Sequence, residues 1–296
     1  MSVKSILYVF GGEAHELNAL SSALALAGAS RAFLRILHIA APPILPDALG
    51  IGNYAVAAYG DRSIIDVLEK DARELTERAS AYVTDYCRRE AVSLQADGST
   101  PVMGQSRAVF RVVTGVPDIC LASEAYLQDL VVGAHDNRPG GDFTTILTTL
   151  FAANRPILLL PRVPGAPLSE TGFARKFVFA WDGSRTSARA LQAAVPYMLH
   201  AEQVHLLGIG EDKGGDMISE ADVQTYLRSH CVAAEFVHAQ RQNRDIGDAV
   251  LNEAAALGAD LLAMGAYGHG HVGEMLLGGV TDHVLKHGRL PLLLAR

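Results

Sequence analysis

The residues most suited to chemistry lie in a glycine-rich segment near the C-terminus. Glycines stand at positions 265, 268, 270, 273, 278 and 279, directly after an apolar run from Leu261 to Met264. The run is typical of a buried parallel strand, and we expect a helix to begin near Gly279. A glycine-rich loop between a strand and a helix lets backbone N–H groups converge, and the helix adds its positive dipole end. The segment therefore predicts a cradle for an anion, most naturally a phosphate; a surface loop that needs glycine only for its turns is the alternative.

A second candidate is the turn Asp182-Gly183-Ser184, which follows an apolar strand-like segment from Lys176 to Trp181. An aspartate at a strand end can accept hydrogen bonds from amine or hydroxyl groups of a ligand. Nucleophilic catalysis is disfavoured, because the sequence places no histidine to act as a base for Ser184. Turn capping explains both polar residues, so we expect no catalytic residue here.

Histidines near the C-terminus raise the question of a metal site. His283 and His287 share a helix face at i,i+4 spacing, and His269 and His271 lie in the glycine-rich segment. No cysteine or carboxylate cluster completes a ligand set in the sequence, so we expect no metal site. Asp245, at the start of a predicted helix, is expected to be a solvated capping residue.

Composition limits the classes of function. The chain has 296 residues, of which 49% are hydrophobic and 19% charged, as expected for two folded domains with large cores. A net charge of −7 argues against nonspecific binding to nucleic acid or to an anionic membrane. There is no apolar run long enough to span a membrane, and Ile6 to Phe10 is too short for a signal peptide. Three scattered cysteines without a Cys-x-x-Cys pair complete the pattern of a cytoplasmic protein.

The predicted elements occur twice along the chain. Strands alternate with helices in each half, which predicts parallel βαβ units and an open α/β sheet. Residues 154–160 match 289–294, and residues 128–133 match 259–265 with one residue fewer. We predict domains at 1–162 and 175–296, joined by a linker at 163–174. The first half is longer than the second, mainly because of a loop from Ala41 to Arg62 and the helix after it. The apolar residues of this loop are expected to fold over the end of the first half's sheet.

The second half resembles the universal stress protein family. The family pattern Gly-x2-Gly-x9-Gly-[Ser/Thr] lies over Gly265, Gly268 and Gly278, and the family's first-strand exit lies over Asp182-Gly183-Ser184. The resemblance implies two tandem, open, doubly wound parallel sheets of five strands each, of the adenine nucleotide alpha hydrolase-like fold, packed as a pseudo-dimer. It also implies ATP or another adenine nucleotide, with or without Mg²⁺, beside the glycine loop in many members but not in all.

The resemblance also implies the binding residues. It assigns Asp182 and Ile209 to the base and ribose, and the glycine loop to the phosphates and ribose. The full set is Ala180, Asp182, Ile209, Met264, Gly265, Gly268, His269, Gly278, Gly279, Val280 and Thr281. In a doubly wound sheet the ligand lies where the strand order reverses, and the strands ending at Asp182 and Gly265 would flank that point.

Two departures from the family pattern matter. Gly279 stands where the family has Ser or Thr, so a phosphate would lose a hydrogen bond worth about 0.5–1.5 kcal/mol, for which Thr281 could partly substitute. In the first half, Gly11 stands where Asp182 stands in the second. The segment of the first half that corresponds to the glycine loop has no second glycine in register, and its residues Asp136 and Asp142 would repel a phosphate. We therefore expect a degenerate first site.

These observations predict a tandem stress-response protein that binds one adenine nucleotide in its second half and acts as a sensor or binding module. A weak ATP hydrolase and a nucleotide-free structural or interaction protein are the alternatives. A homodimer and an unidentified protein partner are compatible with each of them.

Substitution of Gly268 by aspartate tests the predicted loop. Gly268→Asp should abolish nucleotide binding, because it adds a Cβ and a negative charge where backbone must approach phosphate. Calorimetric titration of ATP measures the effect. Equal binding by wild type and variant would place the site elsewhere.

Overall fold

The computed structural model describes residues 3–40, 62–98, 107–135, 143–161, 174–210, 218–241, 244–266 and 279–296. The predicted loop from Ala41 to Arg62 lies outside these ranges except for its last residue. Most of the predicted linker and residues 267–278 of the glycine-rich segment also lie outside them. Among the helices of these ranges, none combines the length and apolar character that a membrane span requires.

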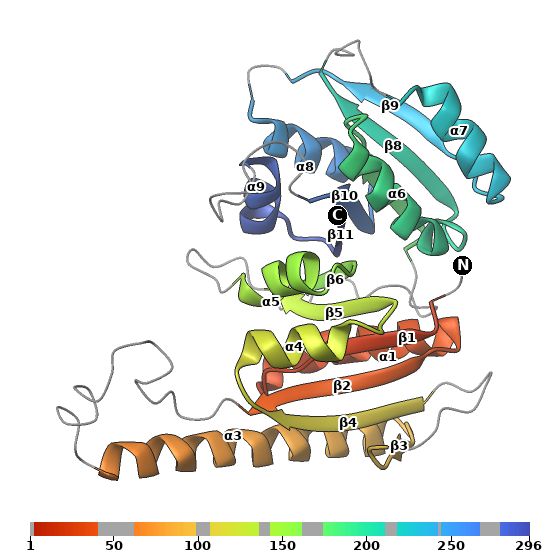
Figure 1. The fold of residues 1–296 in the computed structure, drawn as a ribbon. Helices are drawn as coiled ribbons and strands as arrows, with labels where there is room; N and C mark the ends of the chain where they lie inside the picture. The colour runs from red at the N-terminus through yellow and green to blue at the C-terminus, as the bar shows by residue number, and fades with distance from the viewer. Residues whose placement is uncertain are drawn as a thin grey trace.

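The strands form a single mixed sheet that runs through both halves (Figure 1). Its eleven strands follow the order β3-β4-β2-β1-β5-β6-β11-β10-β7-β8-β9. The first half supplies β1 (Ser5–Val9), β2 (Phe33–Ala40), β3 (Leu94–Gln95), β4 (Arg107–Thr114), β5 (Leu130–His135) and β6 (Ile157–Pro161). The second half supplies β7 (Lys176–Ala180), β8 (Gln203–Ile209), β9 (Glu235–Ala239), β10 (Leu261–Gly265) and β11 (Leu292–Ala295).

Two details of the predicted architecture are corrected. The expected two sheets are one, because β6 and β11 pair antiparallel while all other neighbouring strands are parallel. The first half has six strands, since the two-residue β3 adds to its edge beside β4. The last strands of the two halves pair with each other, whereas the packing of the halves as a pseudo-dimer stays a prediction.

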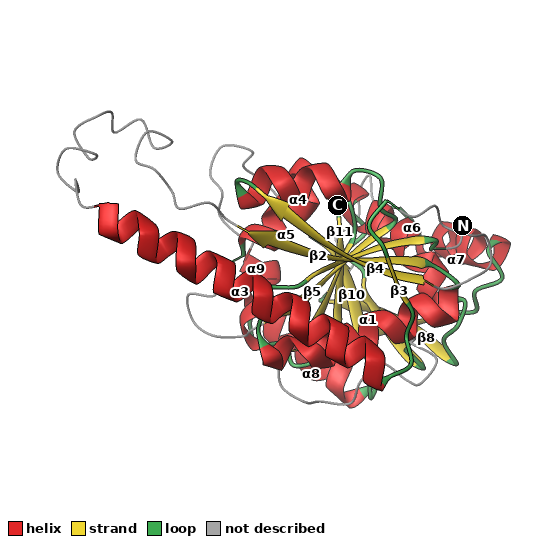
Figure 2. Ribbon diagram, turned by 90° about the horizontal axis from the view of Figure 1, so that it is seen from below, coloured by secondary structure: helices red, strands yellow, loops and turns green. Residues whose placement is uncertain are grey.

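Helices cover both faces of the twisted sheet (Figure 2). In the first half they are α1 (Leu17–Ser30), α3 (Arg62–Arg89), α4 (Pro117–Ala125) and α5 (Thr144–Leu147), with a 3-10 turn η1 (Ala14–Glu16) and a π-helical turn η3 (Thr148–Ala152). In the second half they are α6 (Arg185–Met198), α7 (Glu220–Ser229), α8 (Ile246–Ala256) and α9 (Gly279–His287). α3 has 28 residues and its counterpart α7 has 10, which accounts for part of the greater length of the first half, as predicted.

Each face of the sheet carries a core that both halves share. On one face, buried residues of α1 and α3 belong to the same cluster as those of α6 and α7. On the other face, buried residues of α4 and α5 cluster with those of α8 and α9. The halves are therefore joined by apolar burial as well as by the backbone bonds between β6 and β11.

Matching hydrogen bonds show the duplication directly. The Oδ2 atom of Asp129 accepts hydrogen bonds from the backbone N–H groups of residues 4 and 5, at 2.7 and 3.0 Å. The Oδ2 atom of Asp260 does the same with residues 175 and 176, at 3.0 and 2.9 Å. Each aspartate ties the segment before one strand to the start of its neighbour, β5 to β1 and β10 to β7.

Equivalent backbone bonds also correct the predicted alignment of the halves. The N–H of Phe10 donates to Leu37 at 2.9 Å, and the N–H of Trp181 donates to Leu207 at 2.8 Å, so Phe10 corresponds to Trp181. With this register, Gly133 lies opposite the last residue of β1, and Met264 lies opposite the last residue of β7. Gly265 therefore matches Ala134 rather than Gly133, and the predicted one-residue shortening of the first half is wrong.

The cysteines are free thiols. Cys87 is buried, and this burial raises the pKa of its thiol. Cys120 is partly buried and Cys231 is exposed.

A leucine-to-alanine change in the junction tests the shared core. Leu293 in β11 pairs with Leu158 in β6 and is 2% exposed. Leu293→Ala should lower the free energy of unfolding by about 2–5 kcal/mol while the chain still unfolds in one transition, because the cores span both halves. Urea denaturation measures both quantities. Leu127→Ala is the control, since Leu127 is 87% exposed and its loss should change stability by less than about 0.5 kcal/mol. Two transitions, only one of them shifted, would contradict the shared core.

Candidate functional site

The strand order of the second half reverses between β7 and β10. From β7 the chain adds β8 and β9 on one side, and β10 and β11 on the other. Ala180 at the end of β7 lies directly opposite Met264 in β10. The sequence prediction that these two strands flank the switch point is confirmed. Ligands of doubly wound sheets bind at this kind of carboxyl edge.

The turn after β7 holds Asp182 at this edge. Asp182 is exposed, and its Oδ1 accepts a hydrogen bond from the backbone N–H of Ser184 at 2.9 Å. Ser184 is the N-cap of α6, and its Oγ accepts from the N–H of Ser187 at 3.1 Å. Gly183 adopts a φ of 75°, which is unfavourable for a residue with a Cβ. The predicted capping function of Asp182 and Ser184 is confirmed, and it fixes the Asp182 carboxylate beside β7.

Gly265 allows the start of α6 to lie against the end of β10. A Cβ at this position would lie 3.1 Å from the backbone N of Ser187 and 3.2 Å from the backbone C of Thr186. Because the neighbouring atoms are backbone, they have little freedom to move away. Gly265 therefore has a structural reason to be glycine that is independent of any ligand.

The last glycine of the glycine-rich segment, Gly279, is the first residue of α9. A Cβ on Gly279 would meet no heavy atom within 4 Å, so the position has room for a side chain. Val280 packs partly buried against the core, and Thr281 is 4% exposed. The predicted residues Gly268, His269 and Gly278 lie outside the described residues.

Two arginines near the edge were not selected from the sequence. Arg185 and Arg189 are exposed, lie one turn apart on α6, and line a surface hollow together with Thr186, Ala188 and Ile218. Their spacing of four residues, just after the Asp182 turn, is the signal that could have identified them.

Ile209 and Ala180, expected near the base, are each partly buried at the edge, as a contact surface for a ring requires.

The corresponding edge of the first half is filled by the protein itself. Gly11 follows Phe10, as Asp182 follows Trp181. A Cβ on Gly11 would lie 3.0 Å from Oε2 of Glu16, whose side chain is 4% exposed. This Oε2 also accepts from the N–H of Glu13 at 3.2 Å. A buried carboxylate thus occupies the space where the second half has the Asp182 side chain, and it adds a negative charge that a phosphate would meet.

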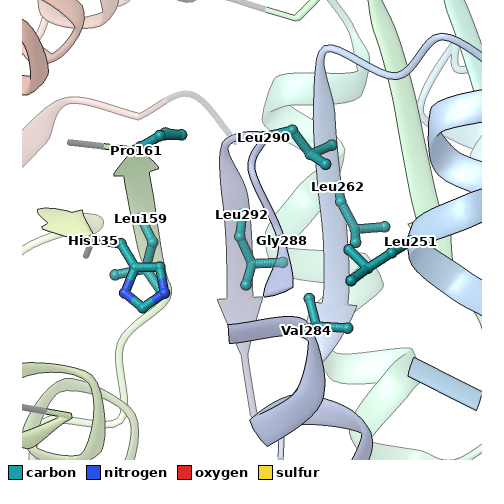
Figure 3. A pocket seen from close by; sticks show the side chains of 9 residues that line it. All are labelled: His135, Leu159, Pro161, Leu251, Leu262, Val284, Gly288, Leu290 and Leu292. Atoms are coloured by element: carbon teal, nitrogen blue, oxygen red, sulfur yellow. The ribbon is translucent and has the colours of Figure 1, made fainter. Parts of the chain in front are cut away.

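A small hollow, with a cavity volume of ≈ 10 Å³, lies at the junction of the halves (Figure 3). Its lining is His135, Leu159, Pro161, Leu251, Leu262, Val284, Gly288, Leu290 and Leu292. The Nε2 atom of His135 lies 2.5 Å from the carbonyl oxygen of Leu285 in α9, which links the halves. The apolar lining suits a packing contact better than an anionic ligand.

One expectation about the histidines is corrected. The sequence suggested that no carboxylates accompany His283, yet the fold brings Asp245 and Asp248 beside it. The rings of His283 and His287 also lie close, with 4.4 Å between their centroids.

The fold and the edge define a class: the chain is a tandem α/β protein with the adenine nucleotide alpha hydrolase-like fold. Residues 174–296 match the model of the Universal stress protein family. The C-terminal half of the chain therefore belongs to that family. The family model does not extend over the first half, whose likeness to the second half rests on the fold and on the repeated hydrogen bonds.

Solved structures support the same fold over the whole chain. A universal stress protein from Archaeoglobus fulgidus is 14% identical with a TM-score of 0.63, covering 99% of this chain and 96% of its own. A putative universal stress protein from Pseudomonas aeruginosa is 15% identical with a TM-score of 0.52, covering 99% and 93%. A universal stress protein in complex with cAMP covers 55% of this chain and 99% of its own at 18% identity, but its TM-score of 0.30 is too low to bear on the site. No curated protein matches the chain in sequence.

Substitution of Gly265 by alanine tests the close contact at the edge. Gly265→Ala should destabilise the protein by about 1–3 kcal/mol, because the added methyl group meets backbone atoms that cannot move freely. Gly28→Ala, in α1, is the control: its Cβ meets nothing within 4 Å, and alanine favours a helix over glycine by about 0.5–1 kcal/mol. Thermal and urea unfolding of both variants give the comparison. A Gly265→Ala variant at least as stable as wild type would show that α6 does not approach β10 so closely.

Proposed function

We propose that the second half binds an adenine nucleotide at the carboxyl edge between β7 and β10, and that the chain works as a nucleotide-responsive binding module in a cellular stress response. The observation that carries this proposal is the pairing of Ala180 with Met264. It places the exposed Asp182 carboxylate and the Gly265 backbone on adjacent strand ends at the switch point. The sequence pattern at 265, 268 and 278 supplies the phosphate-binding loop in this proposal.

The chemistry of the edge suits the parts of a nucleotide. Asp182 would accept hydrogen bonds from the adenine amine or ribose hydroxyls, since its Oδ1 is held by the Ser184 N–H. Ile209 and Ala180 would contact the ring or ribose. The free N–H groups at the start of α9 would face the phosphates, and the exposed cations Arg185 and Arg189 would favour a negatively charged ligand electrostatically.

Binding is favoured over catalysis. Ser184, the hydroxyl residue nearest the turn, is engaged as the cap of α6. The Ser184 Oγ accepts from the N–H of Ser187, and among the hydrogen bonds of the described residues none joins this Oγ to a histidine or a carboxylate; the Asp182 carboxylate is bonded to the Ser184 backbone N–H instead. A nucleophile needs such a base within hydrogen-bond reach. We therefore propose a sensor, located in the cytoplasm, rather than a metabolic enzyme.

The two halves should differ in binding, with one nucleotide per chain. The buried Glu16 carboxylate stands beside Gly11 in the first half, where the second half has Asp182. A phosphate or ribose would have to displace the Glu16 carboxylate or bind next to its negative charge. Mass spectrometry of small molecules released from the purified protein would identify the ligand and its stoichiometry.

Conservative replacement of Asp182 tests the base and ribose contact. Asp182→Asn keeps an oxygen for the Ser184 N–H but removes the charge, so the fold should persist while ATP binding weakens roughly tenfold or more, as for loss of a charged hydrogen bond of about 1.5–3 kcal/mol. Asp97→Asn is the matched control, because Asp97 also accepts a backbone N–H, from Gly98 at 3.0 Å, but lies in the first half. Equilibrium dialysis with labelled ATP measures both.

Gly279→Ser gives a change in the opposite direction. The position has room for the side chain, and a restored hydroxyl donor should tighten ATP binding about threefold to tenfold, corresponding to ~0.7–1.4 kcal/mol. Binding unchanged in Asp182→Asn, or two nucleotides per chain, would contradict the proposed site. Binding only in Gly279→Ser would mean that the natural chain has lost its ligand.

A further inference from the structure

A cluster of metal-ligating side chains lies where α8 begins beside α9. Asp245 is the N-cap of α8, Asp248 lies in its first turn, and His283 faces them from the second turn of α9. One ligand atom from each of the three residues can be chosen so that all lie within 4.8 Å of one another. We propose that Asp245, Asp248 and His283 bind a divalent transition-metal ion of the Zn²⁺ or Co²⁺ type.

The distances are close to those of a coordination sphere. Ligands about 2.0–2.2 Å from a tetrahedral or octahedral ion lie roughly 3–3.6 Å apart. His283 Nε2 and Asp248 Oδ1 are already 2.8 Å apart in a hydrogen bond. Asp245 is exposed, and its ligand atom lies within 4.8 Å of the other two.

The backbone between the two aspartates is adapted to this histidine. A Cβ on Gly247 would lie 2.7 Å from the Cβ of His283 and 2.8 Å from atoms of its ring. Only glycine at this position lets α9 bring His283 so close to the start of α8. The residue thus serves the approach of the histidine to both carboxylates, since Gly247 stands between them in sequence.

Asp245 supplies a separate indication. The other two capped helices of the described second half, α6 and α7, begin with Ser184 and Ser219, whose side chains accept a backbone N–H. Asp245 occupies the same position in α8 but makes no such side-chain bond. The hydrogen bond between His283 and Asp248 accounts for those two residues without a metal, whereas the exposed Asp245 carboxylate is not held by a capping bond.

The donor set selects the class of ion. One imidazole nitrogen with two carboxylates is a mixed N/O set, which suits Zn²⁺, Co²⁺ or Ni²⁺ better than Ca²⁺ or Mg²⁺, whose sites are built from oxygen. Two negative charges offset the ion's charge, whereas the positive end of the α8 dipole opposes it weakly at this exposed position. Water would complete the coordination.

Titration of tag-free, chelator-treated full-length protein with Co²⁺, followed by visible absorption, tests the site in the absence of nucleotide. The wild-type protein should bind one equivalent of Co²⁺ at its tightest site. Asp245→Asn keeps a good N-cap residue and should weaken that binding at least tenfold, the lower limit seen for loss of even an outer-shell partner. His283→Gln should do the same. Calorimetry with Zn²⁺ provides a second readout.

The matched control is Asp282→Asn, which removes a carboxylate from the same helix. Asp282 pairs with Lys286 at 2.8 Å and is not part of the cluster, so this variant should bind as wild type does. Circular dichroism checks that each variant is folded. Absence of a one-equivalent site in wild type, or equal affinity in wild type, Asp245→Asn and His283→Gln, would overturn the proposal. Nucleotide binding plays no part in these measurements, so the result is independent of the function proposed above.

Discussion

The antiparallel pairing of β6 with β11 is the constraint on which the rest of the molecule depends. Both strands are the last of their half, and both are apolar and buried. Without a partner each would be an exposed apolar sheet edge, which is a site of aggregation. Pairing them removes both edges and also brings the cores on each face together. Because the strands run in opposite directions, the carboxyl edges of the two halves open toward opposite ends of the sheet, so the two switch points do not combine into one site.

The two halves have kept a common frame while diverging at their strand ends. Asp129 and Asp260 tie equivalent strands together with the same pair of backbone hydrogen bonds. These bonds satisfy backbone groups at the starts of β1 and β7, so their loss would cost stability in either half. At the opposite ends, the residues that follow β1 and β7 differ. There Asp182 marks one half, while Gly11 and the buried Glu16 mark the other.

Close backbone approach organises the second half. Gly183 provides a turn with positive φ, and Gly265 lets α6 lie against β10. Gly247 brings α8 against His283 in the same way. Gly265 and Gly247 have a packing reason and Gly183 a conformational one, and two of them also place a polar side chain: Gly183 holds the turn of Asp182 at the switch point, and Gly247 lets His283 lie beside two aspartates. Packing and the positions of potential ligands are therefore coupled in this half.

The sequence by itself determined the alternation of strands and helices, the duplication, and the position of Asp182 and Gly265 at strand ends. These features follow from local patterns, namely apolar runs, capping residues and glycine spacing, which one chain segment carries alone. The register of the first half was misjudged, because matching Gly133 to Gly265 followed glycine identity, whereas backbone pairing makes Ala134 the equivalent.

Only the tertiary structure decided which distant residues meet. The burial of Glu16 beside Gly11 depends on how η1 follows β1, and the meeting of Asp245 and Asp248 with His283 depends on the packing of α8 against α9. Arg185 and Arg189 became relevant once α6 was placed at the edge. The short β3 and the single continuous sheet likewise arise from pairing between distant strands. Contacts of this kind depend on the relative position of whole elements, which no local pattern of residues encodes.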